Sequence, residues 1–356
     1  MLLDVLPLQN NTARLVRVYG DEPCITLPSE LPAPEGGVWA VTELGDYCFS
    51  EKPRNLPGAE ALCRYEIAEN GVALTRAFGR DLTGKTRRYD LDFGDAPAET
   101  DLHPVCGNFL EEVTLPDSLR VIGSCAFYNC RKLRTLSVGA GELTVGSDVF
   151  LNCFALADLI VRADPEEPTG LFALVNNITE AVRALFWLPG EDAPRAGLWY
   201  PAYWEDVEES PAHILLHTFS GQGYHYRQCF LNGKFLCAEY GAIFPEGHAS
   251  EDMNIMAMLC FDRLRWPWNL TEKAREAYTT FLKANPGRVV SRLLKAQDND
   301  SLKSLLALDV LDAAGFAEAA QLAAKADNAA AAALLADAEY SKQAAKPKKK
   351  RYDFDF

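Results

Sequence analysis

Apolar residues recur at a fixed spacing in the first half of the chain. The segment 110–132 (LEEVTLPDSLRVIGSCAFYNCRK) aligns with 133–155 (LRTLSVGAGELTVGSDVFLNCFA) at a constant offset of 23 residues, and 156–161 (LADLIV) begins a third copy. Self-similarity at a fixed period of roughly 20–29 residues is typical of solenoid proteins. The pattern therefore predicts a solenoid rather than a single globular core.

Each copy opens with the pattern L-x-x-[LV]-x-[LV]. Its apolar positions are Leu110, Val113 and Leu115, then Leu133, Leu136 and Val138, then Leu156, Leu159 and Val161. One unit cannot bury its own apolar face, so stacked units bury a continuous core and their short strands form a parallel sheet.

Three further positions repeat at the same offset and predict ladders inside the solenoid. They are the pairs Phe127 and Phe150, Asn129 and Asn152, and Cys130 and Cys153. The asparagines could satisfy main-chain groups at the bend, because buried polar groups need partners.

An earlier unit precedes these copies. Residues 25–31 (ITLPSEL) resemble 113–119 (VTLPDSL), and VTELGDYCFS places Leu44, Gly45 and Phe49 on Ile122, Gly123 and Phe127. The combined pattern LP-x-S-L…IG-x-x-A-F-x-x-C-x-x-L resembles the BspA-type leucine-rich repeat of bacteria over residues 15–50 and 108–163. This resemblance implies a solenoid that displays a binding face.

The binding face is predicted on the strand surface of the solenoid. Successive side chains of a strand point to opposite faces, so the residues between the buried apolar positions point outward. The outward positions are Glu112, Thr114, Thr135, Ser137, Asp158 and Ile160.

The insert between the repeat units contains GRDLTGKT (79–86), which matches the phosphate-binding pattern G-x-x-x-x-G-K-[ST]. A phosphate loop of this kind is followed by a helix whose N-terminus holds the phosphates. Here Tyr89, Leu91 and Phe93 alternate with polar residues, which predicts a strand. We therefore expect a β-hairpin, and a nucleotide-binding enzyme that uses Lys85 and Thr86 is the alternative hypothesis.

The middle of the chain, residues 164–268, is rich in aromatic residues and is divided into short elements by prolines. Its stretch GQGYHYRQCF (221–230) provides either exposed anchors for a partner or the core of a domain, and we favour the core.

In HILLH, His213 and His217 would share one face of a helix. The residue after His213 is Ile214 and not the glutamate that a metalloprotease helix needs, so we expect no metal and no cofactor.

The C-terminal part has helical periodicity. Thr271 can cap a first helix that NPG (285–287) ends, and further helices are predicted at 288–296, 298–307, 312–325 and 327–343. The segment 316–338 resembles the paired helices of an ankyrin repeat. The tail KPKKKRYDFDF is expected to be solvated.

Charge and composition limit the possible partners and location. The net charge of −15 and the pI of about 4.9 disfavour nucleic acid and anionic membranes as partners. The N-terminal stretch MLLDVLPLQN has no basic leader, and no long apolar run suggests a membrane span. Ten scattered cysteines predict free, mostly buried thiols in a reducing cytoplasm.

Together these patterns predict an α+β multidomain protein. It would comprise a leucine-rich-repeat domain (1–163) with a hairpin inserted at about 64–105, an aromatic α+β middle domain (164–268), ankyrin-like helices (269–343) and a tail (344–356). The predicted function is a non-enzymatic, cytoplasmic protein-interaction module that acts as scaffold or adaptor for a protein partner. A structural subunit of a homo-oligomer is a second alternative, beside the nucleotide-binding enzyme.

Overall fold

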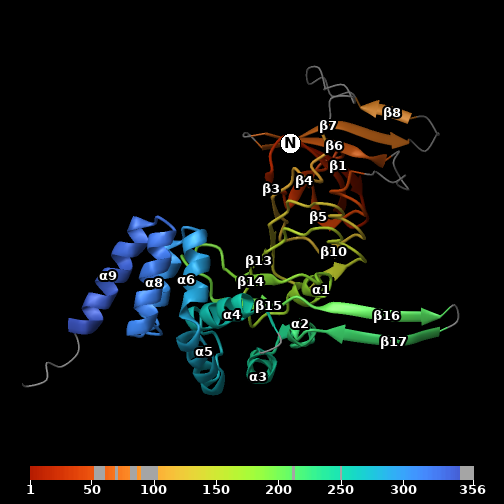
Figure 1. Cartoon of the computed structure of the whole chain (residues 1–356). Coiled ribbons are helices and arrows are strands. Elements are labelled where there is room, and N and C mark those ends of the chain that lie inside the picture. Colours follow the sequence, from red (N-terminus) through yellow and green to blue (C-terminus); the bar gives the residue numbers. More distant parts are fainter. Residues whose placement is uncertain are drawn as a thin grey trace, which may run out of the picture. The chain divides into compact units, whose positions relative to one another are not determined.

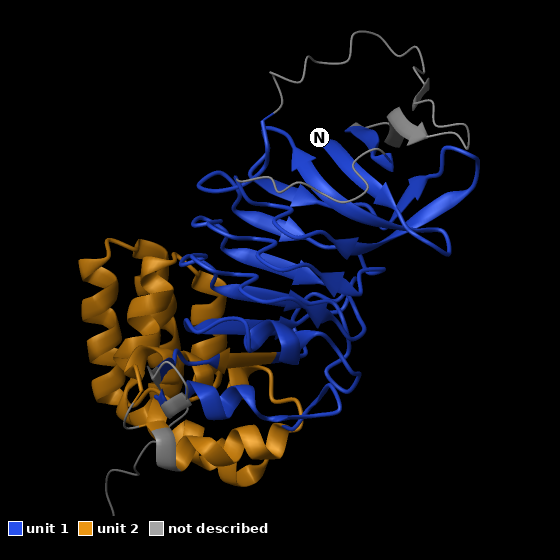
Figure 2. Ribbon diagram, turned by 90° about the vertical axis from the view of Figure 1, so that its right-hand side faces the viewer, with its two compact units in different colours: residues 1–196, 200–236 blue, residues 197–199, 237–356 orange. Residues whose placement is uncertain are grey.

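The computed structural model describes residues 1–51, 61–68, 71–80, 86–89, 103–210, 213–248 and 251–344. The chain forms two compact units, unit 1 with residues 1–196 and 200–236, and unit 2 with residues 197–199 and 237–356 (Figure 2). The sequence predicts domain boundaries at 163/164 and 268/269. These differ from the limits of the two compact units, and as domain boundaries they remain a prediction.

Unit 1 is a β-solenoid, as the repeats predict, and its short strands stack into two sheets (Figure 1). One is a six-stranded sheet in the order β3-β9-β11-β13-β14-β15, in which residues 197–199 of the last strand are counted with unit 2. These strands are β3 (Cys24–Thr26), β9 (Glu112–Thr114), β11 (Thr135–Val138), β13 (Asp158–Val161), β14 (Val182–Phe186) and β15 (Ala196–Tyr200). From β3 to β14 all neighbours are parallel.

The second sheet has nine strands in the order β12-β10-β5-β2-β1-β6-β7-β8, with β4 paired to β5. The strands are β1 (Leu2–Pro7), β2 (Thr12–Tyr19), β4 (Glu30–Pro32), β5 (Val38–Leu44), β6 (Cys63–Ala68), β7 (Gly71–Arg80), β8 (Thr86–Tyr89), β10 (Val121–Ile122) and β12 (Thr144–Val145). From β12 to β2 the pairs are parallel, and from β2 to β8 they are antiparallel. The segment inserted between repeats therefore extends a solenoid sheet.

The register confirms the alignment of the repeats. Val113 pairs with Ile25 on one side and with Leu136 on the other, and Ile122 pairs with Leu44. All these side chains are buried. The upstream unit inferred from ITLPSEL is thus a true turn of the solenoid.

The predicted ladders are present between the turns. The Phe127 ring stacks on Phe49 and Phe150, with centroid distances of 4.9 and 5.6 Å. Asn152 Nδ2 donates to Asn129 Oδ1 at 2.7 Å. Both asparagines have a positive φ (+64° and +65°), a conformation that asparagine tolerates better than most residues. The asparagines therefore support the bend through their own backbone as well as through their side chains.

The cysteines and glycines of the repeat also contact the preceding turn. The thiol of Cys153 donates to the carbonyl of Phe127 at 3.0 Å, and that of Cys130 donates to Phe49 at the same distance. A Cβ at Gly146 would lie only 2.6 Å from the Ser124 nitrogen. Glycine is therefore required where two turns approach most closely.

The remaining elements of unit 1 follow the solenoid. They are α1 (Leu171–Val175), the hairpin β16 (Trp204–Ser210) and β17 (His213–Ser220), α2 (Gly223–Arg227), and the small hairpin β18 (Phe230–Leu231) and β19 (Lys234–Phe235). Tyr226 and Arg227 are completely buried, so these two residues of GQGYHYRQCF belong to the core. His213 and His217 lie on a strand, so their placement on one helix is wrong.

Unit 2 is helical. Its helices are α3 (Cys237–Gly247), α4 (Met253–Arg265), α5 (Glu272–Ala284), α6 (Pro286–Lys295), α7 (Asn299–Ala307), α8 (Ala313–Lys325) and α9 (Ala329–Ala344). The predicted helices from residue 271 onward are confirmed within a few residues, and Thr271 caps α5 as expected. The sequence analysis did not predict α4, whose 13 residues lie inside the aromatic segment.

The last helices pack side by side, α6 on α8 and α8 on α9 (Figure 1). Helix α7 packs on α9. Their apolar faces are closed by small or branched residues such as Ala319, Ala323 and Leu335, which are buried. This is a stack of helical pairs, but the resemblance to ankyrin repeats stays a prediction. The basic tail from residue 345 lies outside the described residues.

Candidate functional site

The six predicted binding residues lie together on the six-stranded sheet, in two rows across its strands. In the first row Thr135 pairs with Glu112 on one side and with Asp158 on the other. In the second row Ser137 lies between Thr114 and Ile160. Because parallel register places paired residues on the same face, the sheet brings all six onto one surface.

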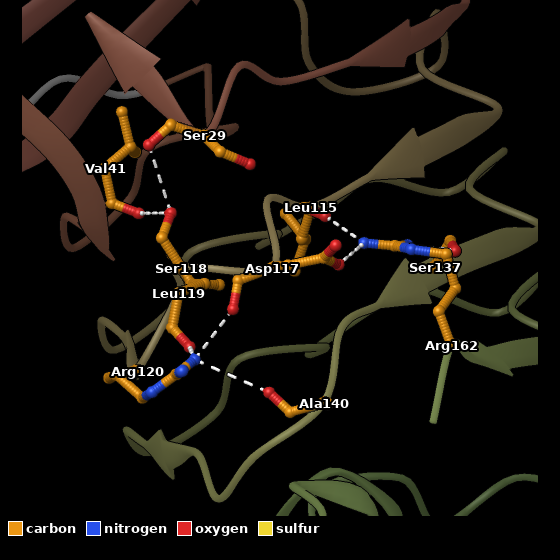
Figure 3. Close-up of polar contacts among 10 residues, drawn as sticks. All are labelled: Ser29, Val41, Leu115, Asp117, Ser118, Leu119, Arg120, Ser137, Ala140 and Arg162. Carbon is orange, nitrogen blue, oxygen red and sulfur yellow. Dashed lines mark hydrogen bonds and ion pairs between the residues drawn. The ribbon is translucent and has the colours of Figure 1, made fainter. Parts of the chain in front are cut away.

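The second row is more enclosed than a free binding surface would be. Ser137 is only 8% exposed, and its hydroxyl accepts a hydrogen bond from Arg162 Nη1 (Figure 3). The same guanidinium donates through Nη2 to the Leu115 carbonyl and to Asp117 Oδ1, both at 2.6 Å. Ser137 is therefore part of a polar clasp that ties neighbouring turns together.

The loop between β9 and β10 is fixed by similar contacts (Figure 3). The Ser118 hydroxyl donates to the Val41 carbonyl at 2.7 Å, and Arg120 Nη1 donates to the Asp117 carbonyl at 2.8 Å. The backbone beside the second row is thus held by side-chain to main-chain bonds from two turns. The predicted face rests on a rigid support.

The first row is more accessible and carries charge. Glu112 is exposed, while Thr135 and Asp158 are half-buried. Asp158 forms an ion pair with Arg183 at 2.6 Å, so its charge is largely compensated within the sheet. Glu112 is therefore the residue of the predicted face that is most open to a partner, and Thr135 lies beside it.

Sequence reasoning missed two arginines at this face, Arg162 and Arg183. Each lies 25 residues after its partner on the preceding strand, Ser137 and Asp158 respectively, which is two positions beyond the repeat offset of 23. An alignment at the strict repeat period does not pair them. Arg162 directly follows β13, whereas Arg183 lies within β14 in register with Asp158. The available signal was therefore an arginine at or just after a strand of the repeat.

An exposed thiol, Cys24, pairs with Glu112 at the edge of this sheet. Loss of water contact and the carboxylates of Glu112 and Glu111 raise the pKa of the Cys24 thiol. The neutral thiol therefore dominates at physiological pH, which disfavours nucleophilic chemistry at this position. All ten cysteines are free and seven are buried, as the sequence predicts.

The phosphate-loop motif lies between two antiparallel strands. Gly79 pairs with Arg87 and Arg80 with Thr86, so Thr86 begins strand β8. A phosphate loop would have a helix there. Lys85 and the loop 81–85 lie outside the described residues, but the flanking strands support the hairpin rather than the nucleotide-binding hypothesis.

No group of three or more histidine, cysteine, aspartate or glutamate side chains could hold a metal ion in the part of the chain that the structure describes. Among the same residues, no helix has both the length and the apolar character that a membrane span requires.

Comparison with known proteins gives one structural relative with a low overall similarity. It is a leucine rich cell surface protein from Faecalibacterium prausnitzii A2-165, with 17% identity and a TM-score of 0.25. The aligned region covers 45% of this chain and 31% of that protein, so the chain spans about a third of the relative's length. No curated protein matches the sequence.

A family match agrees with the repeats seen in the fold. Residues 106–181 match the family described as "BspA type Leucine rich repeat region (6 copies)". Such repeats indicate a protein-interaction or surface-binding role for this part of the chain, without identifying a partner. The central part of this solenoid, residues 106–181, is therefore a BspA-type leucine-rich-repeat region.

Proposed function

We propose that this protein is a non-enzymatic protein-interaction module that acts as a scaffold or adaptor. Its contact surface would be the outer face of the six-stranded sheet, with Glu112, Thr114, Thr135, Ser137, Asp158 and Ile160. The observation that carries the proposal is the parallel register that brings all six onto one face. Stacked repeats build extended surfaces of this kind.

The burial pattern supports different tasks for four of the six residues. Glu112 and Thr135 would contact the partner directly, because they lie in the more open row. Ser137 and Asp158 would support the face, because their polar groups already bond to Arg162 and Arg183. We further propose a cytoplasmic location, since the exposed Cys24 and the other free thiols fit a reducing compartment.

The test is affinity capture with the full-length protein and a charge-reversed face. The variant combines Glu112→Lys with Thr135→Arg, which alters the open row without touching the Arg162 clasp. The matched control combines Glu30→Lys with Thr144→Arg, two exposed positions on strands of the other sheet. Captured proteins are compared by quantitative mass spectrometry, and the strongest partner is then purified.

We expect the purified partner to bind the wild type and the control equally, and to bind the face variant at least about tenfold more weakly. Charge reversal at a contact surface costs attraction and adds like-charge repulsion. A partner that binds all three proteins with the same affinity would contradict this face as the contact surface.

A further inference from the structure

The ladder of turns in unit 1 ends with unpaired hydrogen-bond donors. The terminal rung is defined here as residues 147–153. In the rung before it, the N–H groups of Cys125, Phe127 and Asn129 donate to carbonyls of the terminal rung at 2.9, 3.0 and 3.0 Å. The equivalent N–H groups of the terminal rung belong to Asp148, Phe150 and Asn152. None of these three donates to any residue that the structure describes.

The next segment of the chain directs its carbonyls elsewhere. The carbonyls of Val175, Ile178 and Glu180 accept hydrogen bonds from the buried Arg227, at 3.0, 3.0 and 2.8 Å. A regular further turn would instead offer carbonyls to the terminal rung. Arg227 therefore closes the solenoid in a way that leaves one edge of the ladder unfilled.

A hollow of about 220 Å³ lies beside this edge, between residues 148–156 and 177–180. Its rim carries two exposed apolar side chains, Leu151 (48% exposed) and Phe154 (67% exposed). Solvent contact of adjacent large apolar side chains is unfavourable, and such patches commonly mark interaction sites.

The charged groups at the hollow have one sign. Asp148 and Glu180 contribute exposed carboxylates, and no lysine or arginine lines the hollow among the described residues. A ligand with basic side chains is therefore favoured over an anion, although three N–H groups are present.

We propose that the open edge of the terminal rung binds a segment of a partner protein that adopts the same run of turns as residues 124–129 and carries apolar and basic side chains. Carbonyls at alternate positions of the segment would accept from the N–H groups of Asp148, Phe150 and Asn152, which adds one rung to the ladder. An apolar side chain would cover Leu151 and Phe154. This surface is distinct from the outer face of the six-stranded sheet and goes beyond the proposed function.

A suitable probe is a peptide copy of the chain's own repeat. Residues 122–132 supply such a rung in the fold, where the Ser124 and Ala126 carbonyls accept from the preceding turn at 3.1 and 2.7 Å. This segment ends in Arg131 and Lys132. The synthetic peptide carries Cys125→Ser and Cys130→Ser to prevent oxidation, and a fluorescein label for anisotropy.

We expect saturable binding of this peptide to the full-length protein, and an affinity loss of at least about tenfold in Phe154→Asp. Glu180→Gln is expected to weaken binding by about threefold. This loss of affinity should be smaller at high salt, because salt screens the attraction between Glu180 and the basic peptide. The control Val38→Asp changes another exposed apolar residue (53% exposed) and leaves binding unchanged. Amide hydrogen exchange of residues 147–153 should slow when the peptide is bound.

Three results would overturn the proposal. The first is no saturable binding, or equal affinity for the wild type and Phe154→Asp. The second is equal or tighter binding of a peptide with Arg131→Glu and Lys132→Glu, since the donors would then select an anion. The third is self-association, seen by light scattering, that Phe154→Asp abolishes, because the occupant would be a second copy of this chain. The Glu112→Lys, Thr135→Arg protein should bind the peptide normally, which separates this proposal from the proposed function.

Discussion

The repeats of unit 1 and the last helices of unit 2 satisfy their polar groups over different distances. In the solenoid, the Phe127 N–H and the Cys153 thiol bond to residues in neighbouring turns. In the helices, the main-chain groups bond within their own element, and Asp312 caps α8 by accepting from the Gly315 N–H at 2.8 Å. A defect in one turn should therefore affect its neighbours, whereas a defect in a cap should stay within its helix.

The largest effect is expected for Phe127→Ala. The ring is fully buried and stacks between two others, so its removal should cost about 3–5 kcal/mol in the free energy of unfolding. Urea unfolding measures the loss, and hydrogen exchange should quicken across residues 110–161. The partly exposed Phe109 is the control, and Phe109→Ala should cost far less. Faster exchange confined to the turn of Phe127 would show that the turns do not support one another.

A smaller loss is expected for Asn152→Ala, about 2 kcal/mol, from the hydrogen bond to Asn129 and the left-handed backbone. Asn152→Gly tolerates the positive φ, so it should lose only the hydrogen-bond part, about 1 kcal/mol. Thermal unfolding of both variants separates the two contributions. Equal losses would mean that the backbone conformation carries no cost.

The buried thiols make the solenoid sensitive to alkali. Burial raises the pKa of the Cys48 and Cys153 thiols to about 12, whereas an unfolded cysteine has a pKa of about 8.5. Above the unfolded pKa the folded chain retains protons that the unfolded chain has lost. Stability is therefore complete below about pH 8.5 and falls as the pH rises toward 12, by about 1.4 kcal/mol per pH unit for each thiol.

Cys153→Ser tests this dependence. Serine can still donate to the Phe127 carbonyl and does not titrate, so the variant should lose stability less steeply between pH 9 and 11. The difference in slope should be about 1.4 kcal/mol per pH unit. Urea unfolding under reducing conditions at several pH values measures it. Identical slopes would show that the Cys153 thiol ionises freely in the folded protein.

The smallest effect is expected for Asp312→Ala, about 1 kcal/mol, because it removes the N-cap of α8. Asp312→Asn keeps a good cap and serves as the matched control. Hydrogen exchange should quicken only in the first turn of α8. An equal increase in α6 and α9 would remove the contrast between the two regions.

The repeat pattern predicted much of unit 1 because each turn buries equivalent residues against the next. Ile25, Val113 and Leu136 share one register position, as their places in the alignment require. The later helices were also predictable, since caps such as Thr271 and apolar periodicity act over one or two turns of chain. Local and periodic signals are present in the sequence itself.

Other features depend on residues that meet only after folding. Arg227 is buried with its guanidinium bonded to main-chain carbonyls far away in sequence, and no motif marks it. The predicted site is similar: the sheet places all six residues on one face, but the Arg162 clasp encloses Ser137. The alternation along a strand predicts on which face of the sheet a side chain lies. Its exposure also depends on which other side chains, such as Arg162, cover that face.

The sequence by itself determined the repeat period, the register of the strands and the positions of the last helices, because these follow from apolar spacing and local capping. It also contained evidence against a phosphate loop, in the strand alternation of Tyr89, Leu91 and Phe93, of which Leu91 and Phe93 lie outside the described residues while β8 covers Thr86–Tyr89. Only the tertiary structure decided which outward residues stay open and where the ladder ends. Both depend on single long side chains, Arg162 and Arg227, whose partners are main-chain or polar atoms that many sequences could supply.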